Sequence, residues 1–449
     1  MILRSHLARH LGAQESAAVA AHVTNAVYNG RSLSQIHQKK ARKTAPGTAP
    51  APRNPLAYHL PSLNPPDPLM RMLRDEVETT KVSRNAQARA LEDLFKLFTQ
   101  QRSTIARNDY LSVPRYRNAY LRYHFPLNFA RAAYALQKVA EVYPRITELD
   151  QVIDLGAGPG SAALATLFSL PSRKRNYVLY DRSRAALGVA RRLVDGCRAD
   201  AGVKRDLGSF QTRRLQLPTI PTSSEGTLLW IAMVYNELGS NRRDGPKAEA
   251  FAERLTRSTR PGSVVLLVEP ALRGPTIELM RLHDALIARP GWRVLAPCTH
   301  EAPCPLLEIR SKPWCHFHFR WRPPEFTRHA AESLGLKSPQ ASLAFLALER
   351  TGAQSLSDDA KAKRSPRRAR VISDKMTSST GKPMFYICAE GARNQLKSPP
   401  QPCWRGDLLE QAQGGTYRRL AQDGNRPRER RKPTTKGQNQ GDQSQGDAS

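Results

Sequence analysis

Two kinds of hydrophobic pattern alternate along the middle of the chain. Short, nearly continuous apolar runs occupy residues 152–155, 177–180, 227–234 and 263–268, and such runs are typical of strands buried on both faces of a parallel sheet. Segments with apolar residues at helical spacing lie between them. The alternation predicts an α/β fold with a doubly wound sheet, and the apolar run at 341–350 predicts one further strand.

The chain ahead of the first predicted strand has helical spacing only. Apolar residues recur every three or four positions in 67–107 and again in 118–143, which predicts a helical cap on the sheet domain. The second region is rich in aromatic residues, which at this spacing are more typical of a core than of a base-stacking surface. Four basic residues accompany them and fit either a binding face or a solvated face: Arg115, Arg117, Arg122 and Arg131.

A glycine-rich turn follows the first predicted strand. Asp154 lies at the end of the strand, and Gly156, Gly158 and Gly160 follow at alternate positions before a helical segment. Glycines let the backbone approach a ligand because they carry no side chain. Asp181 ends the second predicted strand, where an acidic side chain suits the hydroxyls of a ribose. The turn resembles the first motif of class I S-adenosylmethionine-dependent methyltransferases, which implies S-adenosyl-L-methionine as cofactor; a tight turn without a ligand is the alternative.

The next two predicted strands end in polar residues that belong at the same edge of the sheet. Asn236 and Glu269 follow the third and fourth apolar runs. Ligands bind at the carboxyl edge of such sheets, so we expect both residues to line one crevice with the glycine turn. The residues at 236–239, Asn-Glu-Leu-Gly, differ from the Asn/Asp-Pro-Pro-Tyr/Phe of many amino-methyltransferases, and no Pro-Cys supplies a nucleophile for cytosine C5 methylation. No catalytic residue is assigned on this basis, and Asn236 is kept as a candidate.

Charge indicates the class of partner. The 449 residues carry a net charge of +31, with dense basic runs at 361–370 and 426–432. Such an excess favours a polyanion through counterion release and makes nucleic acid the first candidate; a solvated surface with basic tails is the alternative. No run of about 20 apolar residues occurs, so no membrane partner is expected. The amino end, rich in Arg, His and Ala, fits either a mitochondrial presequence or an ordinary amphipathic helix.

Four of the six cysteines form a second candidate site. They follow the spacing C-x5-C-x10-C-x72-C and are Cys298, Cys304, Cys315 and Cys388. Neighbouring prolines keep the first three on irregular backbone, where the sulfurs can converge on zinc or on an iron–sulfur cluster. Zinc ribbons usually pair cysteines as C-x2-C, so the wide spacing favours a polynuclear cluster.

Other interpretations of the cysteines stay open. Four unrelated thiols are one alternative, and a ligand set in which a histidine replaces a thiol is another, with His300, His316 and His318 as candidates. Cys197 and Cys403 stand apart from the set. Because no secretion signal is recognised, we expect a reducing compartment, where cysteines are thiols or metal ligands.

Several motifs occur in a fixed order over most of the chain. They are Asp154-Leu-Gly-Ala-Gly-Pro-Gly-Ser, Asn236-Glu-Leu, Val268-Glu-Pro, Ala296-Pro-Cys-x5-Cys-Pro and Trp314-Cys-His-Phe. Together they resemble the methyltransferase-like small-ribosomal-subunit family of bacteria and mitochondria, over roughly residues 70 to 410. The resemblance implies a class I methyltransferase fold that acts on the small ribosomal subunit or its precursor during assembly. It also implies a [4Fe-4S] cluster on the four cysteines named above, with zinc as the alternative.

Two functions follow from this resemblance and the charge. In the first, the protein methylates ribosomal RNA (rRNA) with S-adenosylmethionine, and Asn236 orients a flipped-out base. In the second, it is a catalytically inactive, rRNA-binding assembly factor that retains the fold and a structural iron–sulfur cluster. The absence of the usual catalytic tetrapeptide favours the second. We expect a monomer in a bacterial cytoplasm or, alternatively, in the mitochondrial matrix.

The composition divides the chain into successive parts. These are a flexible basic segment at 1–66, a helical cap at 67–147, a methyltransferase-like domain at 148–350 with a cysteine-rich metal-binding insertion at 296–322, a small basic β unit at 351–410, and a disordered basic tail at 411–449.

Overall fold

A computed structural model gives the fold. It describes residues 63–100, 109–200, 203, 205–215, 219–238, 247–311, 313–335, 340–352, 367–400, 403–412 and 415–420. Most of the predicted amino-terminal segment, most of the basic run at 361–370 and nearly all of the predicted basic tail lie outside these residues. Within the described residues, no helix has both the length and the apolar composition that crossing a membrane requires.

The large sheet contains the strands predicted from the apolar runs. Its members are β1 (Gln151–Leu155), β2 (Arg175–Asp181), β3 (Leu207–Arg214), β4 (Thr227–Ala232), β5 (Val264–Glu269), β6 (Trp292–Ala296), β7 (Phe317–Arg320) and β8 (Gln340–Arg350). The order is β3-β2-β1-β4-β5-β8-β6, and β7 pairs with β8. Strands β1 to β5 are parallel, whereas β8 is antiparallel to β5 and β6. This is the strand order of a class I methyltransferase, so the predicted fold class is confirmed.

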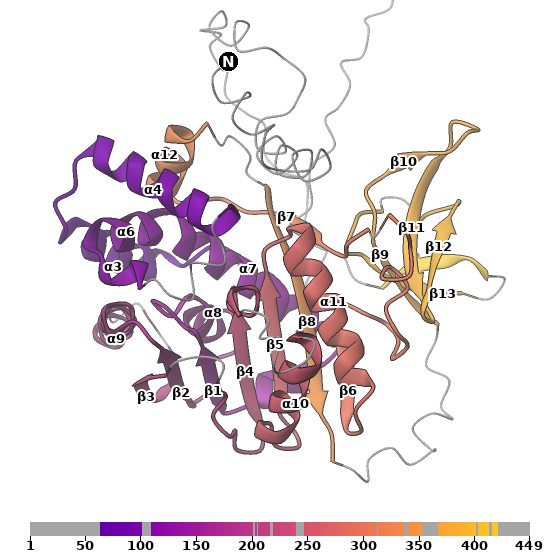
Figure 1. Ribbon diagram of the computed structural model, residues 1–449, viewed down its shortest axis with the longest axis horizontal. Coiled ribbons are helices and arrows are strands. Elements are labelled where there is room, and N and C mark those ends of the chain that lie inside the picture. The colour runs from indigo at the N-terminus through magenta and orange to yellow at the C-terminus, as the bar shows by residue number, and fades with distance from the viewer. Residues whose placement is uncertain are drawn as a thin grey trace, which may run out of the picture.

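Helices cover both faces of the sheet because successive strand residues point to opposite sides. One face packs against α7 (Phe125–Ala140), α8 (Ser161–Ser169) and α9 (Arg184–Ala199), with Val152 and Trp230 in that core. The other face packs against α10 (Lys247–Ser258) and α11 (Arg273–Ile287), with Ile153 and Leu229 in its core. Figure 1 shows α10 and α11 in front of the sheet.

The helices ahead of α7 lie beyond the carboxyl edge of the parallel strands (Figure 1), whereas α7, which the prediction includes in the cap, packs against one face of the sheet. Those ahead of α7 are α3 (Asp67–Glu78), α4 (Arg84–Thr99), the 3-10 turn η2 (Tyr110–Ser112), α6 (Pro114–Ala119) and the π-helical turn η3 (Tyr120–His124). A second 3-10 turn, η4 (Pro144–Glu148), leads into β1, and α12 (Glu325–Ser333) contacts α4. Phe125, Phe129 and Tyr134 are fully buried, which agrees with the predicted core role of the aromatic residues.

A second, antiparallel sheet forms the carboxyl-terminal unit. It consists of β9 (Arg368–Val371), β10 (Met376–Thr377), β11 (Pro383–Ala389), β12 (Ala392–Leu396), β13 (Leu408–Gln411) and β14 (Tyr417–Arg419), in the order β10-β11-β9-β13-β14 with β12 beside β11. The sequence predicts a small β unit at 351–410, whereas the sheet continues to Arg419, within the part predicted to be a disordered tail. The unit has its own apolar core and lies at the opposite end of the molecule from β3 (Figure 1).

Candidate functional site

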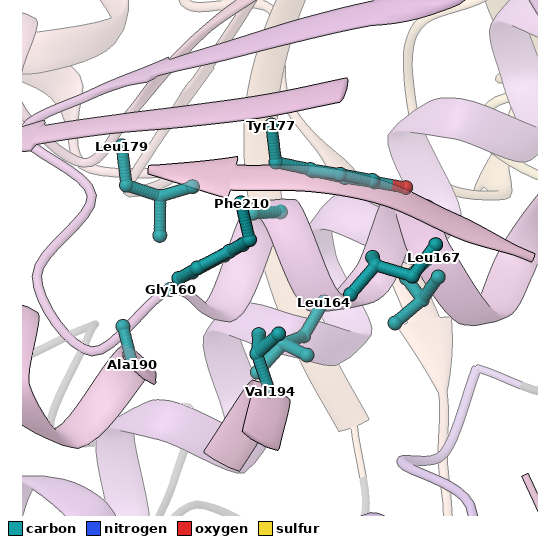
Figure 2. Close-up of a pocket in the computed structure, with 10 residues that line it drawn as sticks. Gly160, Leu164, Leu167, Tyr177, Leu179, Ala190, Val194 and Phe210 are labelled. Carbon is teal, nitrogen blue, oxygen red and sulfur yellow. The ribbon is translucent and has the colours of Figure 1, made fainter. Parts of the chain in front are cut away.

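The three glycines of the turn after β1 all have positive φ, and they face different surroundings. An added Cβ would meet Val234 Cγ2 at 2.4 Å at Gly156, and Leu179 Cδ2 at 3.2 Å and Ala190 Cβ at 3.3 Å at Gly160. Figure 2 shows Gly160 between Leu179 and Ala190 at the start of α8. At Gly158 the nearest atom is Leu111 Cδ1 in the cap, at 3.7 Å. Gly156 and Gly160 therefore allow close packing, whereas a Cβ at Gly158 would meet only Leu111 of the cap within 4 Å.

Asp181 holds this turn from the neighbouring strand. Its Oδ2 accepts a hydrogen bond from the Gly158 N–H at 2.8 Å, and its Oδ1 accepts one from the Ser183 N–H at 2.7 Å. Burial raises the pKa of the carboxyl, and the two amide donors oppose that rise because they favour the charged form. The predicted neighbours Gly158 and Asp181 are thus brought together at the carboxyl ends of β1 and β2.

Asp154 lies beneath the turn. Its Oδ2 accepts a hydrogen bond from the Ala163 N–H in the first turn of α8 at 3.1 Å, whereas its Oδ1 has no hydrogen-bond partner among the described residues. The side chain is 1% exposed, and burial raises the pKa of its carboxyl to about 7. Asp154 therefore joins the strand to the helix from inside the core.

The fourth and fifth strands bring Asn236 and Glu269 together. Asn236 lies in a 3-10 turn, η5 (Tyr235–Glu237), and its backbone N–H donates to Glu269 Oε1 at 3.3 Å. Met233, just after β4, has a φ of 63°, which is uncommon for a residue with a side chain. Its N–H donates to Val268 O at 2.7 Å, which fixes the sharp bend that leads to Asn236.

The cap contributes residues beside the glycine turn that the sequence did not indicate. Leu111 of η2 lies over Gly158, and burial together with Glu237 and Asp181 raises the pKa of Tyr110. Burial also raises the pKa of Tyr120, whose hydroxyl accepts a hydrogen bond from Asn128 Nδ2 at 3.1 Å. Tyr110 and Leu111 lie between the two segments with helical spacing, so only the folded chain reveals that Leu111 lies over the glycine turn.

The four predicted cysteines line one cavity of about 40 Å³. Cys298 and Cys304 come from the loop after β6, Cys315 precedes β7, and Cys388 lies in β11 of the carboxyl-terminal sheet. Burial is the first cause of the raised pKa of each thiol, to about 11 for Cys304 and about 12 for Cys388. The cavity therefore lies between the two sheets and joins segments far apart in sequence.

Only one of the alternative histidines contacts a cysteine of this set among the described residues. His300 Nε2 lies 3.2 Å from Cys388 Sγ. His316 stacks on Trp314 and lies within 3.4 Å of the Arg405 guanidinium, and burial lowers its pKa to about 3. Cys197 lies elsewhere, against Met72 Sδ at 3.6 Å, and Cys403 belongs to the core of the second sheet.

A buried cation completes the cavity. Arg370 of β9 is 2% exposed, pairs with Cys388 across the sheet, and lines the cavity with the cysteines. Its Nε donates to Pro297 O at 2.9 Å and its Nη1 donates to Gly406 O at 3.0 Å. The positive charge and the N–H donors of Arg370 suit a centre formed by negatively charged thiolates. In the described part of the chain, however, no three or more Cys, His, Asp or Glu side chains are arranged to hold a metal ion.

Comparisons with known proteins give a family. The family model for mitochondrial small ribosomal subunit Rsm22 matches residues 115–398. The human mitochondrial ribosome assembly protein METTL17 is 29% identical over 185 residues, which cover 39% of this chain and only 38% of that protein. Among solved structures, the plantazolicin methyltransferase BpumL in complex with SAH is 11% identical, with a TM-score of 0.33 and with 59% of this chain and 99% of that chain covered. A putative RNA methyltransferase from Pyrococcus horikoshii is 13% identical, with a TM-score of 0.29 and with 50% and 83% covered. Because the family model matches more than half of the residues, the chain belongs to the mitochondrial small ribosomal subunit Rsm22 family.

Proposed function

We propose that this protein is a methyltransferase-like assembly factor of the small ribosomal subunit that binds rRNA. The family match over residues 115–398 carries the proposal, and the similarity to a human mitochondrial ribosome assembly protein agrees with it. The net charge of +31 supports RNA as the partner, because neutralising phosphates releases counterions. The family description favours the mitochondrial matrix over a bacterial cytoplasm as the compartment, and we propose a monomer.

The crevice beside Gly158 is the proposed site for S-adenosyl-L-methionine. Gly158 presents backbone without a side chain, and Asp181 places a carboxylate at the end of the neighbouring strand, where ribose hydroxyls bind in this fold class. Gly156, Gly160 and Asp154 support the turn from the packed side. The bound cofactor would supply an electrophilic methyl group, while these residues would hold and orient it.

We also propose that the protein transfers a methyl group to rRNA, with Asn236 as the candidate residue for positioning the base. The bend after Met233 fixes the backbone of Asn236 against Glu269, which suits a residue that positions a base. The alternative is an inactive factor, favoured by the Asn-Glu-Leu-Gly sequence in place of the usual tetrapeptide.

One assay separates these functions. Small subunits from cells lacking the protein would be incubated with purified protein and methyl-labelled S-adenosylmethionine, with Gly158→Arg as the control. Label in rRNA with the intact protein alone identifies an enzyme and allows the base to be mapped. Binding of subunit and cofactor without label identifies an inactive assembly factor. Absence of subunit binding would refute the proposed function.

We also propose that Cys298, Cys304, Cys315 and Cys388 hold a [4Fe-4S] cluster, with zinc as the alternative. The shared buried cavity and the neighbouring Arg370 support a centre with negative charge. Such a centre would attach the carboxyl-terminal sheet to the methyltransferase-like domain. We expect Cys304→Ser to lose bound iron and to destabilise the carboxyl-terminal unit, whereas the buried Cys197→Ser retains the iron. Unchanged iron content and melting in Cys304→Ser would refute the idea, and bound zinc in the wild type would select the alternative.

A further inference from the structure

Arginines gather along the free edge of the large sheet. β3 is the terminal strand in the sheet order, and its exposed Arg213 and Arg214 stand near its carboxyl end. The exposed Arg191 projects from the adjacent helix α9, where its Nη2 donates to Thr212 Oγ1 at 3.1 Å. Since Arg214 is the register partner of Asp181, this cluster begins next to the proposed cofactor site.

The cap adds two more arginines near the same crevice. Arg115 is exposed, and its guanidinium carbon lies 4.8 Å from the centre of the Tyr116 ring. Arg117 is partly exposed and donates to Leu111 O at 2.9 Å and to Ser112 O at 3.1 Å. Arg117 thus contacts η2, which in turn contacts α9. We call Arg115, Arg117, Arg191, Arg213 and Arg214 the arginine rim.

The hydrogen-bond partners of the arginine rim are neutral oxygens. Arg213 Nη2 donates to Gln211 Oε1 at 2.8 Å, and Arg214 Nε donates to Arg182 O at 3.2 Å. The other three arginines donate to hydroxyl groups of Thr212 and Tyr116 and to backbone carbonyls. Neutral acceptors orient a guanidinium but do not offset its charge, so each retains a field that attracts anions.

Arginines on the α10 and α11 side of the molecule have different partners. There, ion pairs join Arg257 to Glu253 at 3.4 Å, Arg289 to Glu249 at 3.0 Å, and Arg281 to Glu278. A carboxylate within 4 Å cancels most of the field of a guanidinium at a distance. The rim arginines, whose acceptors are neutral, therefore keep more of their field than these ion-paired arginines, and more than Arg192 and Arg198 of α9, which pair with Glu76 and Asp195.

We propose that the arginine rim binds the phosphate backbone of RNA beside the Gly158 crevice. The inference rests on the proposed function and adds the surface through which the folded domain meets its RNA. Guanidinium groups bind phosphate oxygens through paired N–H donors, and a row of them follows a chain of phosphates rather than a single anion. A strand held along this rim passes the carboxyl edge of β1 and β2, where a base would have to enter. Arg122 and Arg131 do not belong to it, because burial lowers the pKa of both guanidinium groups, whose N–H groups donate to Asn118 Oδ1, Ser342 O and Asn128 Oδ1.

The test compares two triple variants of the full chain that lose the same charge. Arg191→Gln, Arg213→Gln and Arg214→Gln together remove three rim charges. Arg145→Gln, Arg257→Gln and Arg281→Gln together remove three exposed, ion-paired charges outside the rim. Binding to a 40-nucleotide mixed-sequence RNA hairpin with a single-stranded flank would be titrated from 50 to 300 mM salt, and melting curves would confirm that both variants fold.

We expect the rim variant to bind roughly 10- to 100-fold more weakly at 150 mM salt. The slope of log affinity against log salt concentration should fall in magnitude by about 2 to 3, because each lost phosphate contact reduces that slope by about 0.7 to 0.9. The control variant should stay within about twofold of the wild type. Equal losses in both variants, or no loss in the rim variant, would overturn the assignment of the surface while leaving RNA binding intact. A wild-type chain that binds neither the hairpin nor small subunits would overturn both this inference and the proposed function. Crosslinks to RNA that map to β3 and α9 give independent support, and crosslinks confined to other elements contradict it.

Discussion

Gly158 and Gly160 have different surroundings, and this difference gives a quantitative prediction. Gly160→Ala places a Cβ 3.2 Å from Leu179 and 3.3 Å from Ala190 at a φ of 86°. The left-handed conformation costs about 1 to 2 kcal/mol for a residue with a side chain. Crowding in a packed core adds about 1 to 2 kcal/mol more. We therefore expect Gly160→Ala to lower the free energy of unfolding by about 2 to 4 kcal/mol.

Gly158→Ala makes a matched comparison because its steric surroundings differ. Its φ of 53° carries a similar conformational cost, but the added Cβ meets only Leu111 Cδ1, at an ordinary contact distance of 3.7 Å. We expect a loss of stability of about 1 to 2 kcal/mol. The methyl group instead occupies the space that the proposed cofactor needs, so the affinity for S-adenosylmethionine should fall at least tenfold. Gly160→Ala should change that affinity by less than about threefold, since a difference of 0.6 kcal/mol is about threefold.

Urea unfolding and calorimetric titration with S-adenosylmethionine measure the two quantities separately. We expect Gly160→Ala to lose mainly stability and Gly158→Ala to lose mainly affinity for S-adenosylmethionine. If Gly158→Ala kept full affinity, Gly158 would not face the cofactor. If Gly160→Ala were as stable as the wild type, the tight packing between α8, α9 and β2 would not be the reason for that glycine.

Two further predictions concern buried charges. Because burial raises the pKa of Asp154 from 3.8 to about 7, the folded chain keeps a proton that the unfolded chain releases, so the stability contributed by this carboxyl falls as pH rises from about 4 to 7. Asp154→Asn keeps an acceptor for Ala163 N–H and should flatten the pH dependence of unfolding over that range, by at most about 4 kcal/mol; an unchanged profile would show that the carboxyl is ionised in the fold. Arg370→Met removes the hydrogen bonds to Pro297 O and Gly406 O and should lower the stability of the carboxyl-terminal unit by about 2 to 4 kcal/mol, measured as faster hydrogen exchange in β9 to β13. Arg368→Met, at an exposed position of the same strand, is the control, and equal exchange in the two variants would contradict a junction role for Arg370.

The sheet could be predicted from the sequence because its strands are buried on both faces. The residues at 264–268 are all apolar, and such a run is typical of a strand buried on both faces of a parallel sheet. Because the carboxyl ends of parallel strands lie at one edge of the sheet, the sequence correctly predicted Gly158 near Asp181 and Asn236 near Glu269. The convergence of four cysteines on one cavity was also expected from their spacing, while their ligand remains a proposal.

Features that depend on tertiary contacts could not be predicted in this way. Strands β12 and β14 are short and consist mostly of polar residues, so their pattern does not stand out from loops. The role of Leu111 depends on the path of the cap over the sheet, for which no local pattern exists. Arg370 belongs to a basic run that suggests a solvated or RNA-binding segment, yet the fold buries its guanidinium against Pro297 and Gly406. Likewise, the three glycines look equivalent in sequence and differ only in what each one faces.

The cap links the two proposed ligands of the protein. Leu111 lies over Gly158, and the carbonyl oxygen of the same residue accepts a hydrogen bond from Arg117 of the arginine rim. A cofactor that moves Leu111 must therefore also move Arg117, so the cofactor and RNA should change each other's affinity by the same factor. We expect saturating S-adenosylmethionine to change the affinity for the RNA hairpin by about 5-fold or more, within the usual range of coupling between sites. Gly158→Arg should abolish the change while retaining RNA binding, because its variant side chain fills the crevice and leaves the rim intact. Equal RNA affinity of the wild type with and without cofactor, under conditions where cofactor binding is verified by calorimetry, would show that the cap does not couple the two sites.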